Sequence, residues 1–292
     1  MLFLSWSAIS LPATMSLVAG ILPESKRTMG VSMHSLVRRI PMAAGPVIGG
    51  AFIAWKGEVV GVRYAFILAL LFALVALVLQ QIFVEEQTKS GRAEANPLKL
   101  FKFMSPGFRK LLLADILVRF SEQIPYAFMA IWVIKNHGLS PVTFGVLTTV
   151  EMITALLIYI PVAYFADRGS KKPFVAITFG FFTLFPLILL LSNNIWMFVI
   201  AFVIRGLKEF GEPTRKSMIM DLAPEGQKAG MFGLYYLLRD VVVSLAAFSA
   251  GFLWNISPQA NFLTAFGVGL AGTLFFILFG EDVVIPQKKV RE

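Results

Sequence analysis

The sequence predicts an all-α membrane protein, a bundle of helices that cross a lipid bilayer. Of its 292 residues, 57% are hydrophobic and only 15% are charged, which is more apolar than a soluble globular domain. The charged residues collect in short clusters, and the apolar stretches between them are about twenty residues long, enough to span a ~30 Å hydrocarbon core. These two observations indicate that lipid surrounds most of the chain.

Nine stretches are predicted to cross the membrane as helices. In chain order they cover residues 2–22, 29–55, 61–84, 107–134, 142–166, 173–191, 195–222, 229–254 and 260–280. Several contain Pro or Gly, which membrane helices tolerate where neighbouring helices satisfy the freed backbone groups. The first stretch has no basic residues before it and is interrupted by Pro12, so we predict a membrane helix there and not a signal peptide.

Basic residues mark one side of this predicted bundle. Seventeen lie on alternate connections, namely Lys26, Arg27, Lys89, Arg92, Lys99, Lys102, Arg109, Lys110, Arg168, Lys171, Lys172, Arg215, Lys216, Lys228, Lys288, Lys289 and Arg291. Only Lys56, Arg63 and Lys135 lie on the other connections. Retained Lys and Arg mark the cytoplasmic side, so the pattern predicts an inner-membrane protein with a cytoplasmic C-terminus. Nine helices then place the N-terminus outside, which predicts that a further segment precedes Met1.

The composition argues against several other classes of protein. The net charge of +9 comes from basic residues that lie between apolar stretches, so membrane topology explains it and no nucleic-acid partner is predicted. The chain has no Cys and only two His residues, His34 and His137. We therefore predict no disulfide framework, no metal centre and no cofactor. An integral membrane enzyme would need clustered catalytic groups at a membrane face, which these residues do not supply.

An internal repeat predicts how the helices are organised. At an offset of 201 residues, seven identities fall within positions 12 to 50. The matching pairs are Pro12 and Pro213, Ser16 and Ser217, Pro23 and Pro224, Glu24 and Glu225, Leu36 and Leu237, Arg38 and Arg239, and Gly50 and Gly251. Because six predicted helices separate the copies, the repeat is parallel, as in transporters made of two six-helix halves. We therefore predict a partial first half over 1–84, a cytoplasmic linker over 85–106 and a second half over 107–292.

The segment after the predicted helix 142–166 carries a recognisable motif. Its key positions are Asp167, Arg168, Gly169, Lys171 and Lys172. The segment resembles the loop between the second and third helices of a half in the major facilitator superfamily, a G-x-x-x-D-R-x-G-R-K pattern, although Ala163 replaces the first Gly and Gly169 falls one place early. That resemblance implies a cytoplasmic gating loop that latches the two halves. The residues alone also fit a solvated turn that sets the topology, or a carboxylate that caps the next helix.

A second motif lies on the predicted helix 29–55. It consists of Gly45, Pro46, Gly49 and Gly50. This string resembles the end of the antiporter signature on the fifth helix of the same superfamily, where small residues let helices pack closely. Ser32 and Pro41 stand where that signature has further glycines, and Gly-rich helix packing alone gives a similar string. Together the resemblances imply that this chain corresponds to helices four to twelve of the superfamily. It would then contain nine of the twelve helices of the superfamily's two-half helical bundle.

Twelve ionisable residues fall inside the predicted spans. Placing a charge inside the membrane costs free energy, so these residues are expected to be paired or to face a water-filled cavity. They are Arg38, Arg39, Asp115, Arg119, Glu122, Glu151, Arg205, Lys208, Glu209, Glu212, Arg239 and Asp240. Asp115, Arg119 and Glu122 are spaced so that they share one helical face. The same spacing predicts that Arg205 shares a face with Glu209, and Lys208 with Glu212. Structural ion pairing is the favoured interpretation for most of the twelve. The candidate cavity charge pairs are drawn from Arg38, Arg39, Arg119, Arg205, Glu209, Glu212, Arg239 and Asp240.

Glu151 differs from the others because its predicted helix carries no cation along the span and the residue sits near mid-depth. A carboxylate so placed could bind and release a proton as the cavity opens to each side. We predict Glu151 as the first proton-coupling residue, followed by Glu122 and Asp115. Pairing of Glu151 with an Arg of another helix is an equal alternative. At Arg38, either pairing across a central cavity or an anionic substrate is predicted.

The predicted function is secondary active transport of a small solute by alternating access, with proton-coupled efflux as the favoured form. The predicted partners are the lipid bilayer, a small-molecule substrate and protons. The protein is expected to act as a monomer and not as an enzyme. The alternatives are a nutrient-importing symporter and a transport-deficient truncated fragment, which would transport poorly as the 292-residue form alone.

Overall fold

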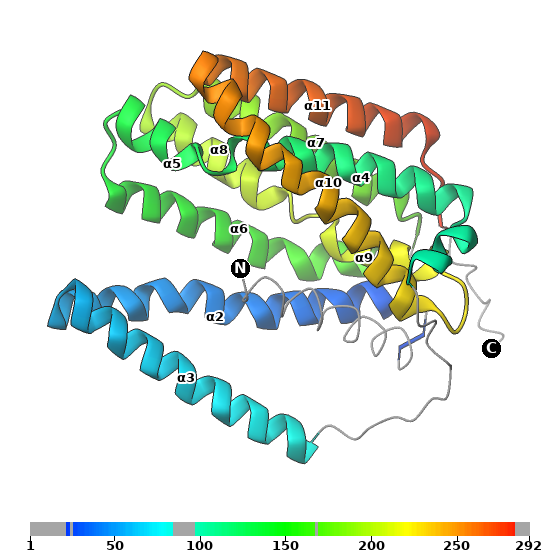
Figure 1. Cartoon of the computed structure of the whole chain (residues 1–292), viewed down its shortest axis with the longest axis horizontal. Coiled ribbons are helices and arrows are strands. Elements are labelled where there is room, and N and C mark those ends of the chain that lie inside the picture. Colours follow the sequence, from blue (N-terminus) through cyan, green and yellow to red (C-terminus); the bar gives the residue numbers. More distant parts are fainter. Residues whose placement is uncertain (1–21, 24–25, 84–96, 167–168, 284–292) are drawn as a thin grey trace. The chain divides into compact units, whose positions relative to one another are not determined.

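The computed structural model describes residues 22–23, 26–83, 97–166 and 169–283. Within these ranges the chain is built from helices (Figure 1). The longer ones are α2 (Arg27–Lys56), α3 (Glu58–Phe83), α4 (Pro106–Tyr126), α6 (Pro141–Ala166), α7 (Lys172–Leu191), α8 (Ile195–Leu207), α9 (Glu212–Leu222), α10 (Lys228–Ile256) and α11 (Pro258–Phe279). Shorter turns are η2 (Pro97–Phe103), α5 (Met129–Ile131) and η3 (Trp132–Asn136). The predicted all-α fold is confirmed, and the helix predicted over 2–22 lies outside the described residues.

The chain forms two compact units. The larger comprises residues 1–35 and 93–292, and the smaller comprises residues 36–92. The first residues of α2 therefore belong to the larger unit, and the rest of α2 belongs with α3 to the smaller one. The division into halves at 1–84, 85–106 and 107–292 stays a prediction.

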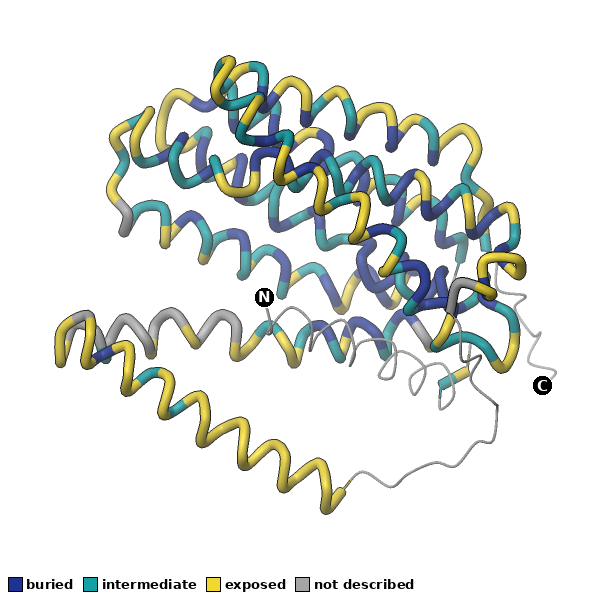
Figure 2. Tube along the Cα trace, viewed as in Figure 1, coloured by how far each residue is buried: buried dark blue, intermediate teal, exposed yellow. Residues whose placement is uncertain are grey.

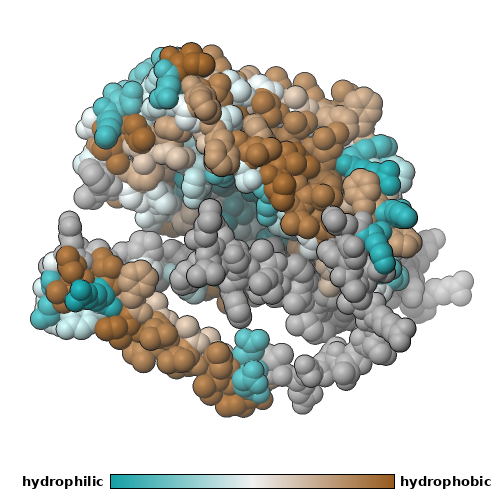
Figure 3. Space-filling model, in the orientation of Figure 1, coloured by the Kyte–Doolittle hydropathy of each residue, from teal (hydrophilic) through white to brown (hydrophobic). Residues whose placement is uncertain are grey.

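Long apolar helices give the protein the surface of a membrane protein. Five segments of the described chain have the length and hydropathy of a membrane span, namely Val59–Phe83, Thr143–Ala166, Lys172–Leu191, Lys228–Ile256 and Pro258–Phe279. α3 has the highest hydropathy of the five, yet Figure 2 shows it exposed along nearly its whole length. Figure 3 shows hydrophobic side chains over the outward face of α10, where Val241, Leu245 and Phe248 are exposed. Exposed apolar surface of this extent suits a chain whose solvent is lipid.

Two predicted helices are interrupted in the structure, which corrects the sequence prediction. The span predicted over 195–222 divides into α8 and α9, with residues 208–211 between them. Pro213 explains this break, because it has no N–H to donate and its ring would clash with the carbonyl group of Glu209. The span predicted over 107–134 ends as α4 at Tyr126, directly after Pro125, and continues only as α5 and the π-helical turn η3.

α4 is the central helix of the larger unit. It packs against α7, α10 and α11, while α8 packs against α6 and α7. One core cluster includes Phe108 of α4, Phe179 of α7 and Tyr235 of α10. A second cluster surrounds Trp132 and Phe198. The polar side chains described below lie between these same helices, so the packing of α4 and α8 fixes their positions.

Gly206 lets α8 approach α6 closely. A Cβ atom built at Gly206 would lie 2.6 Å from the carbonyl oxygen of Glu151 and 2.6 Å from Cβ of Thr154. Gly206→Ala is therefore expected to lower the free energy of unfolding by about 1–3 kcal/mol, the usual cost of overpacking, although Ala is the better helix former. Thermal unfolding of the purified protein in detergent measures this change.

Gly267 of α11 supplies the matched control for this prediction. Among the residues that the structure describes, a Cβ atom there would meet no neighbouring atom within 4 Å. Gly267→Ala should therefore leave stability unchanged or raise it by up to ~1 kcal/mol, the gain in helix propensity. Equal effects of the two substitutions would contradict a close approach of α8 and α6 at Gly206.

Candidate functional site

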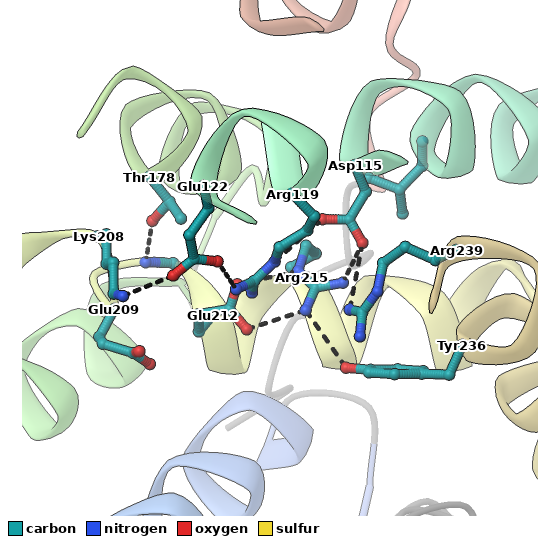
Figure 4. Close-up of polar contacts among 12 residues, drawn as sticks. Asp115, Arg119, Glu122, Thr178, Lys208, Glu209, Glu212, Arg215, Tyr236 and Arg239 are labelled. Carbon is teal, nitrogen blue, oxygen red and sulfur yellow. Dashed lines mark hydrogen bonds and ion pairs between the residues drawn. The ribbon is translucent and has the colours of Figure 1, made fainter. Parts of the chain in front are cut away.

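Charged side chains from several helices meet inside the larger unit. We call this set the charge network; it comprises Asp115, Arg119 and Glu122 of α4, Glu151 of α6, Arg205 of α8, Lys208 of the turn between α8 and α9, Glu212 and Arg215 of α9, and Arg239 of α10. In Figure 4 the labelled side chains of α4 point toward those of α9 and of the turn before it. Each member is within ion-pair distance of the next, so the network runs without a gap from α10 to α8.

Asp115 occupies the most deeply buried end of the network. Nη1 of Arg215 donates to Oδ2 of Asp115 at 2.6 Å, and the hydroxyl group of Tyr235 donates to the same oxygen at 2.9 Å. Nη1 of Arg239 lies 3.6 Å from that oxygen. Asp115 and Arg215 are both fully buried. An unpaired charge here would be very costly, and the converging donors offset the loss of water.

Glu212 connects this buried end to the rest of the network. Its carboxylate accepts from Nη2 of Arg215 at 2.9 Å and from Nε of Arg215 at 3.2 Å. Nη2 of Arg119 donates to Oε1 of the same carboxylate. Glu212 is the first residue of α9, where the helix dipole favours a negative charge. Because Pro213 starts the helix at this place, the break in the predicted span is also what positions Glu212.

Arg119 lies at the centre of the network. Besides Glu212, it binds Glu122 of its own helix, with Nη1 of Arg119 2.8 Å from Oε2 of Glu122. Its Nε is 3.7 Å from Oδ1 of Asp115. The guanidinium group also stacks on Phe182, with its central carbon 4.4 Å from the ring centroid, which adds a cation–π contact. These contacts confirm that Asp115, Arg119 and Glu122 share one face of α4.

Lys208 lies between two carboxylates at the other end of the network. Its Nζ is 2.6 Å from Oε1 of Glu122 and 3.7 Å from Oε1 of Glu151. Glu151 is also held by Arg205, whose Nη1 is 2.5 Å from Oε2 of Glu151. Glu122 and Glu151 therefore each have an arginine partner, and both lie within ion-pair distance of Lys208. The side chain of Glu122 is 21% exposed and that of Glu151 only 4%, so Glu122 is the more accessible of the two.

These contacts resolve the pairing of Glu151 and correct two predicted pairs. Glu151 binds an Arg of another helix, which is the alternative that the sequence left open; its role in proton coupling stays a prediction. Glu209 accepts from the hydroxyl group of Tyr159 at 2.8 Å. Arg205 and Lys208 bind carboxylates of α6 and α4 in place of the predicted partners Glu209 and Glu212. The reason is that α8 ends at residue 207, so no helical face continues past it.

Arg215 and two tyrosines are site residues that the sequence analysis missed. Arg215 was predicted to lie on a cytoplasmic connection, but its side chain is buried beside Asp115 at the most deeply buried end of the network. The spacing of Arg215 three residues after Glu212 was the available signal. Tyr235 binds Asp115 as described, and the ring of Tyr236 lies under Arg239, 4.0 Å from ring centroid to guanidinium carbon. Arg239 also donates from Nε to Asp240, its neighbour in the sequence, at 2.7 Å.

The predicted gating loop is only partly described, since Asp167 and Arg168 lie outside the described residues. Lys171 is fully buried, and its Nζ donates to Asp221 at 2.5 Å and to Ser217 at 2.7 Å. It therefore ties the start of α7 to α9, and it is not the solvated cation that a topogenic turn predicts. Gly169 lies two residues before it and Lys172 directly after it. The latching role of this loop stays a prediction.

Asp282 caps α7 in the structure. It follows α11, and its Oδ1 accepts from the backbone N–H of Lys171 at 3.1 Å and of Lys172 at 3.0 Å. The hydroxyl group of Ser170 donates to its other oxygen. A carboxylate at a helix N-terminus was expected from the sequence, but this one comes from a residue 111 positions later in the chain than Lys171.

The remaining predicted residues lie on α2 within the smaller unit. Arg38 is exposed and Arg39 half-buried. A Cβ atom at Gly45 would meet no atom within 4 Å among the residues that the structure describes, so no close helix contact is seen there. Pro46, Gly49 and Gly50 continue the helix, and the surroundings of their side chains fall outside the description. Helix packing and substrate binding by these residues stay predictions.

Comparison with known proteins gives a family and a fold. The model of the Major Facilitator Superfamily matches residues 111–292. Two similar solved structures are crystal structures of a bacterial homologue of the iron transporter ferroportin in the outward-facing state, the second with soaked iron. The first has 15% identity and a TM-score of 0.62 over 90% of this chain. The second has 14% identity and a TM-score of 0.56 over 91% of this chain. The chain spans 66% of each of those structures. No curated protein matches the sequence.

Proposed function

This chain belongs to the Major Facilitator Superfamily, and from that membership we propose that it works as a secondary active transporter of a small solute, coupled to protons in the direction of efflux. The protein is a multi-pass membrane protein. The proposal extends to the inner membrane as its location, a cytoplasmic C-terminus and a monomeric state. Transport in this family uses alternating access, in which helices rock around a central site. We propose no enzymatic role.

The observation that carries the proposal is Lys208 with its two carboxylates, Glu122 and Glu151. Charges inside a membrane bundle are retained where they mark a path for substrate, ions or protons. Lys208 also lies in the break between α8 and α9, and interrupted helices build the binding sites of many transporters. Protonation of either carboxylate would free Lys208 to bind the other one alone. That exchange of partners links proton binding to the relative position of α4, α6 and α8.

The segment from Gly45 to Gly50 resembles the antiporter signature, and this resemblance supports efflux over uptake. The similar structures are of a homologue of an iron transporter, but we do not propose iron as the solute of this chain. Arginine or lysine side chains hold the carboxylates of Asp115, Glu122, Glu151 and Glu212. Because a metal cation would have to compete with these side chains, we propose an organic solute.

An uncoupler experiment tests both the transport and its direction. Cells that express the chain are loaded with a panel of labelled small organic solutes, and accumulation is compared with empty-vector cells before and after a protonophore is added. For proton-coupled efflux we expect lower accumulation that rises to the vector level when the protonophore collapses the gradient. Higher accumulation that the protonophore abolishes would favour the importing symporter. No difference from the vector for any solute would favour the transport-deficient fragment and contradict the proposal.

A further inference from the structure

η2 is an amphipathic segment directly before α4, and it is not part of the charge network. It belongs to the larger unit, and one of its described faces is buried there. Leu100 is buried and packs against α10 at Gly230, where an added Cβ atom would lie 2.7 Å from Cδ1 of Leu100. Met104, which follows η2, is buried in the same core cluster. These anchors fix which side of η2 faces away from the protein.

The outward side of η2 combines aromatic and basic residues. Phe101 is 49% exposed and Phe103 is 55% exposed. Lys102, between them, is exposed as well. Arg109 in the first turns of α4 lies over Phe101, with its guanidinium carbon 5.3 Å from the ring centroid. Two large apolar rings therefore lie beside two cations on one surface, which we call the η2 surface.

The electrostatics of the η2 surface are one-sided. Residues 97–110 include four basic residues and no Asp or Glu. Glu281 approaches the segment from the end of α11, but it binds Lys110, with Nζ of Lys110 2.7 Å from Oε1 of Glu281. Among the described residues, no carboxylate forms an ion pair with Lys102 or Arg109. Within the described part of the chain, Lys102 and Arg109 therefore present exposed positive charge that no carboxylate neutralises.

The position of η2 selects a lipid interface as its environment. Exposed phenylalanines flanked by cations suit neither water nor the hydrocarbon core, but they suit the boundary between headgroups and acyl chains. The segment leads directly into α4 and lies near the start of α4 and the end of α11, as the pair between Lys110 and Glu281 requires. Clusters of basic residues next to membrane helices attract anionic lipids.

We propose that the η2 surface binds the headgroups of anionic phospholipids, with Lys102 and Arg109 contacting the phosphates while Phe101 and Phe103 enter the acyl boundary. The proposal is independent of the transported solute and of proton coupling. It gives the segment between the two predicted halves a ligand of its own. Lipid bound there would hold η2 against the membrane while the helices move.

The absence of Cys from the sequence makes a direct test straightforward. The variant Phe103→Cys is labelled with an environment-sensitive fluorophore, and the purified chain is reconstituted in phosphatidylcholine vesicles. A minor fraction of nitroxide-labelled lipid is added as either phosphatidylglycerol or phosphatidylcholine. We expect the nitroxide on phosphatidylglycerol to quench the probe about twofold more than that on phosphatidylcholine, and high salt to remove the difference. A probe at Phe101→Cys should give the same result.

Charge-reversal variants decide whether the η2 surface is the cause. Lys102→Glu with Arg109→Glu changes two exposed side chains, so the protein should fold, and tryptophan fluorescence checks this. The preference for phosphatidylglycerol should vanish in this variant. Lys135→Glu, an exposed lysine in η3, is the matched control and should keep the preference. Equal quenching by both lipids in the parent protein, or a preference that survives the double charge reversal, would overturn the proposal. So would a probe shielded from both lipids, which would indicate that protein covers this surface.

Discussion

Replacing Arg215 with Met should lower the free energy of unfolding by about 3–5 kcal/mol, the cost of breaking a buried ion pair by removing one partner. Arg215 is fully buried and donates to both Asp115 and Glu212. Met fills similar space but cannot donate, so Asp115 loses its shortest ion pair and Glu212 loses both of its hydrogen bonds from Arg215. Unfolding of the purified protein in detergent, followed by tryptophan fluorescence, measures the loss.

Two further variants separate the ion pair from a simple packing defect. Lys135→Met removes an exposed cation outside the network, and it should cost less than ~1 kcal/mol. Asp115→Leu combined with Arg215→Met removes both charges of the buried pair and should recover part of the loss. If the double variant lost as much free energy of unfolding as Asp115→Leu and Arg215→Met lose together as single variants, pairing of Asp115 with Arg215 would not explain the effect.

The second large effect is expected for Glu151→Gln in transport. Under the proposed mechanism, uphill transport driven by a proton gradient should fall by about tenfold or more, within the range of coupling energies between linked sites. Gln keeps the shape of Glu and can still accept from Arg205, but it cannot bind and release a proton. Proteoliposomes with an imposed pH gradient, and the solute identified by the uncoupler experiment, measure this rate.

Exchange without a gradient distinguishes lost coupling from lost folding. At equal pH on both sides, Glu151→Gln should still exchange labelled for unlabelled solute, because exchange needs no net proton movement. Glu225→Gln changes an exposed carboxylate outside the network and should behave as the parent in both assays. Retention of uphill transport by Glu151→Gln would show that Glu151 is a structural partner of Arg205 only, and Glu122 would become the first candidate for coupling.

The sequence was sufficient to predict the helices because the length and hydropathy of a membrane span are local properties. α3, α7 and α11 were predicted on that basis alone. The break between α8 and α9 was not predicted, although Gly211 and Pro213 lie there. Membrane helices often tolerate Pro, and only the tertiary contacts decide whether such a residue bends or divides a helix.

The partners of the charged residues were the part that the sequence could not supply. Spacing along one helix correctly grouped Asp115, Arg119 and Glu122. It failed for Arg205 and Lys208, whose partners are 54 and 86 residues away along the chain. Arg215 was missed for a related reason, since a basic residue near the end of a span satisfies the topology rule equally well as a loop residue or as a buried one.

The joint at residues 208–211 has a mechanical consequence. α8 is fastened to α6 through Arg205 and Glu151, whereas α9 is fastened to α4 through Glu212 and Arg119. A rigid helix through both would force these attachments to turn together. Because α8 and α9 are separate helices joined by four residues, a tilt of α6 need not carry α9 and α4 with it.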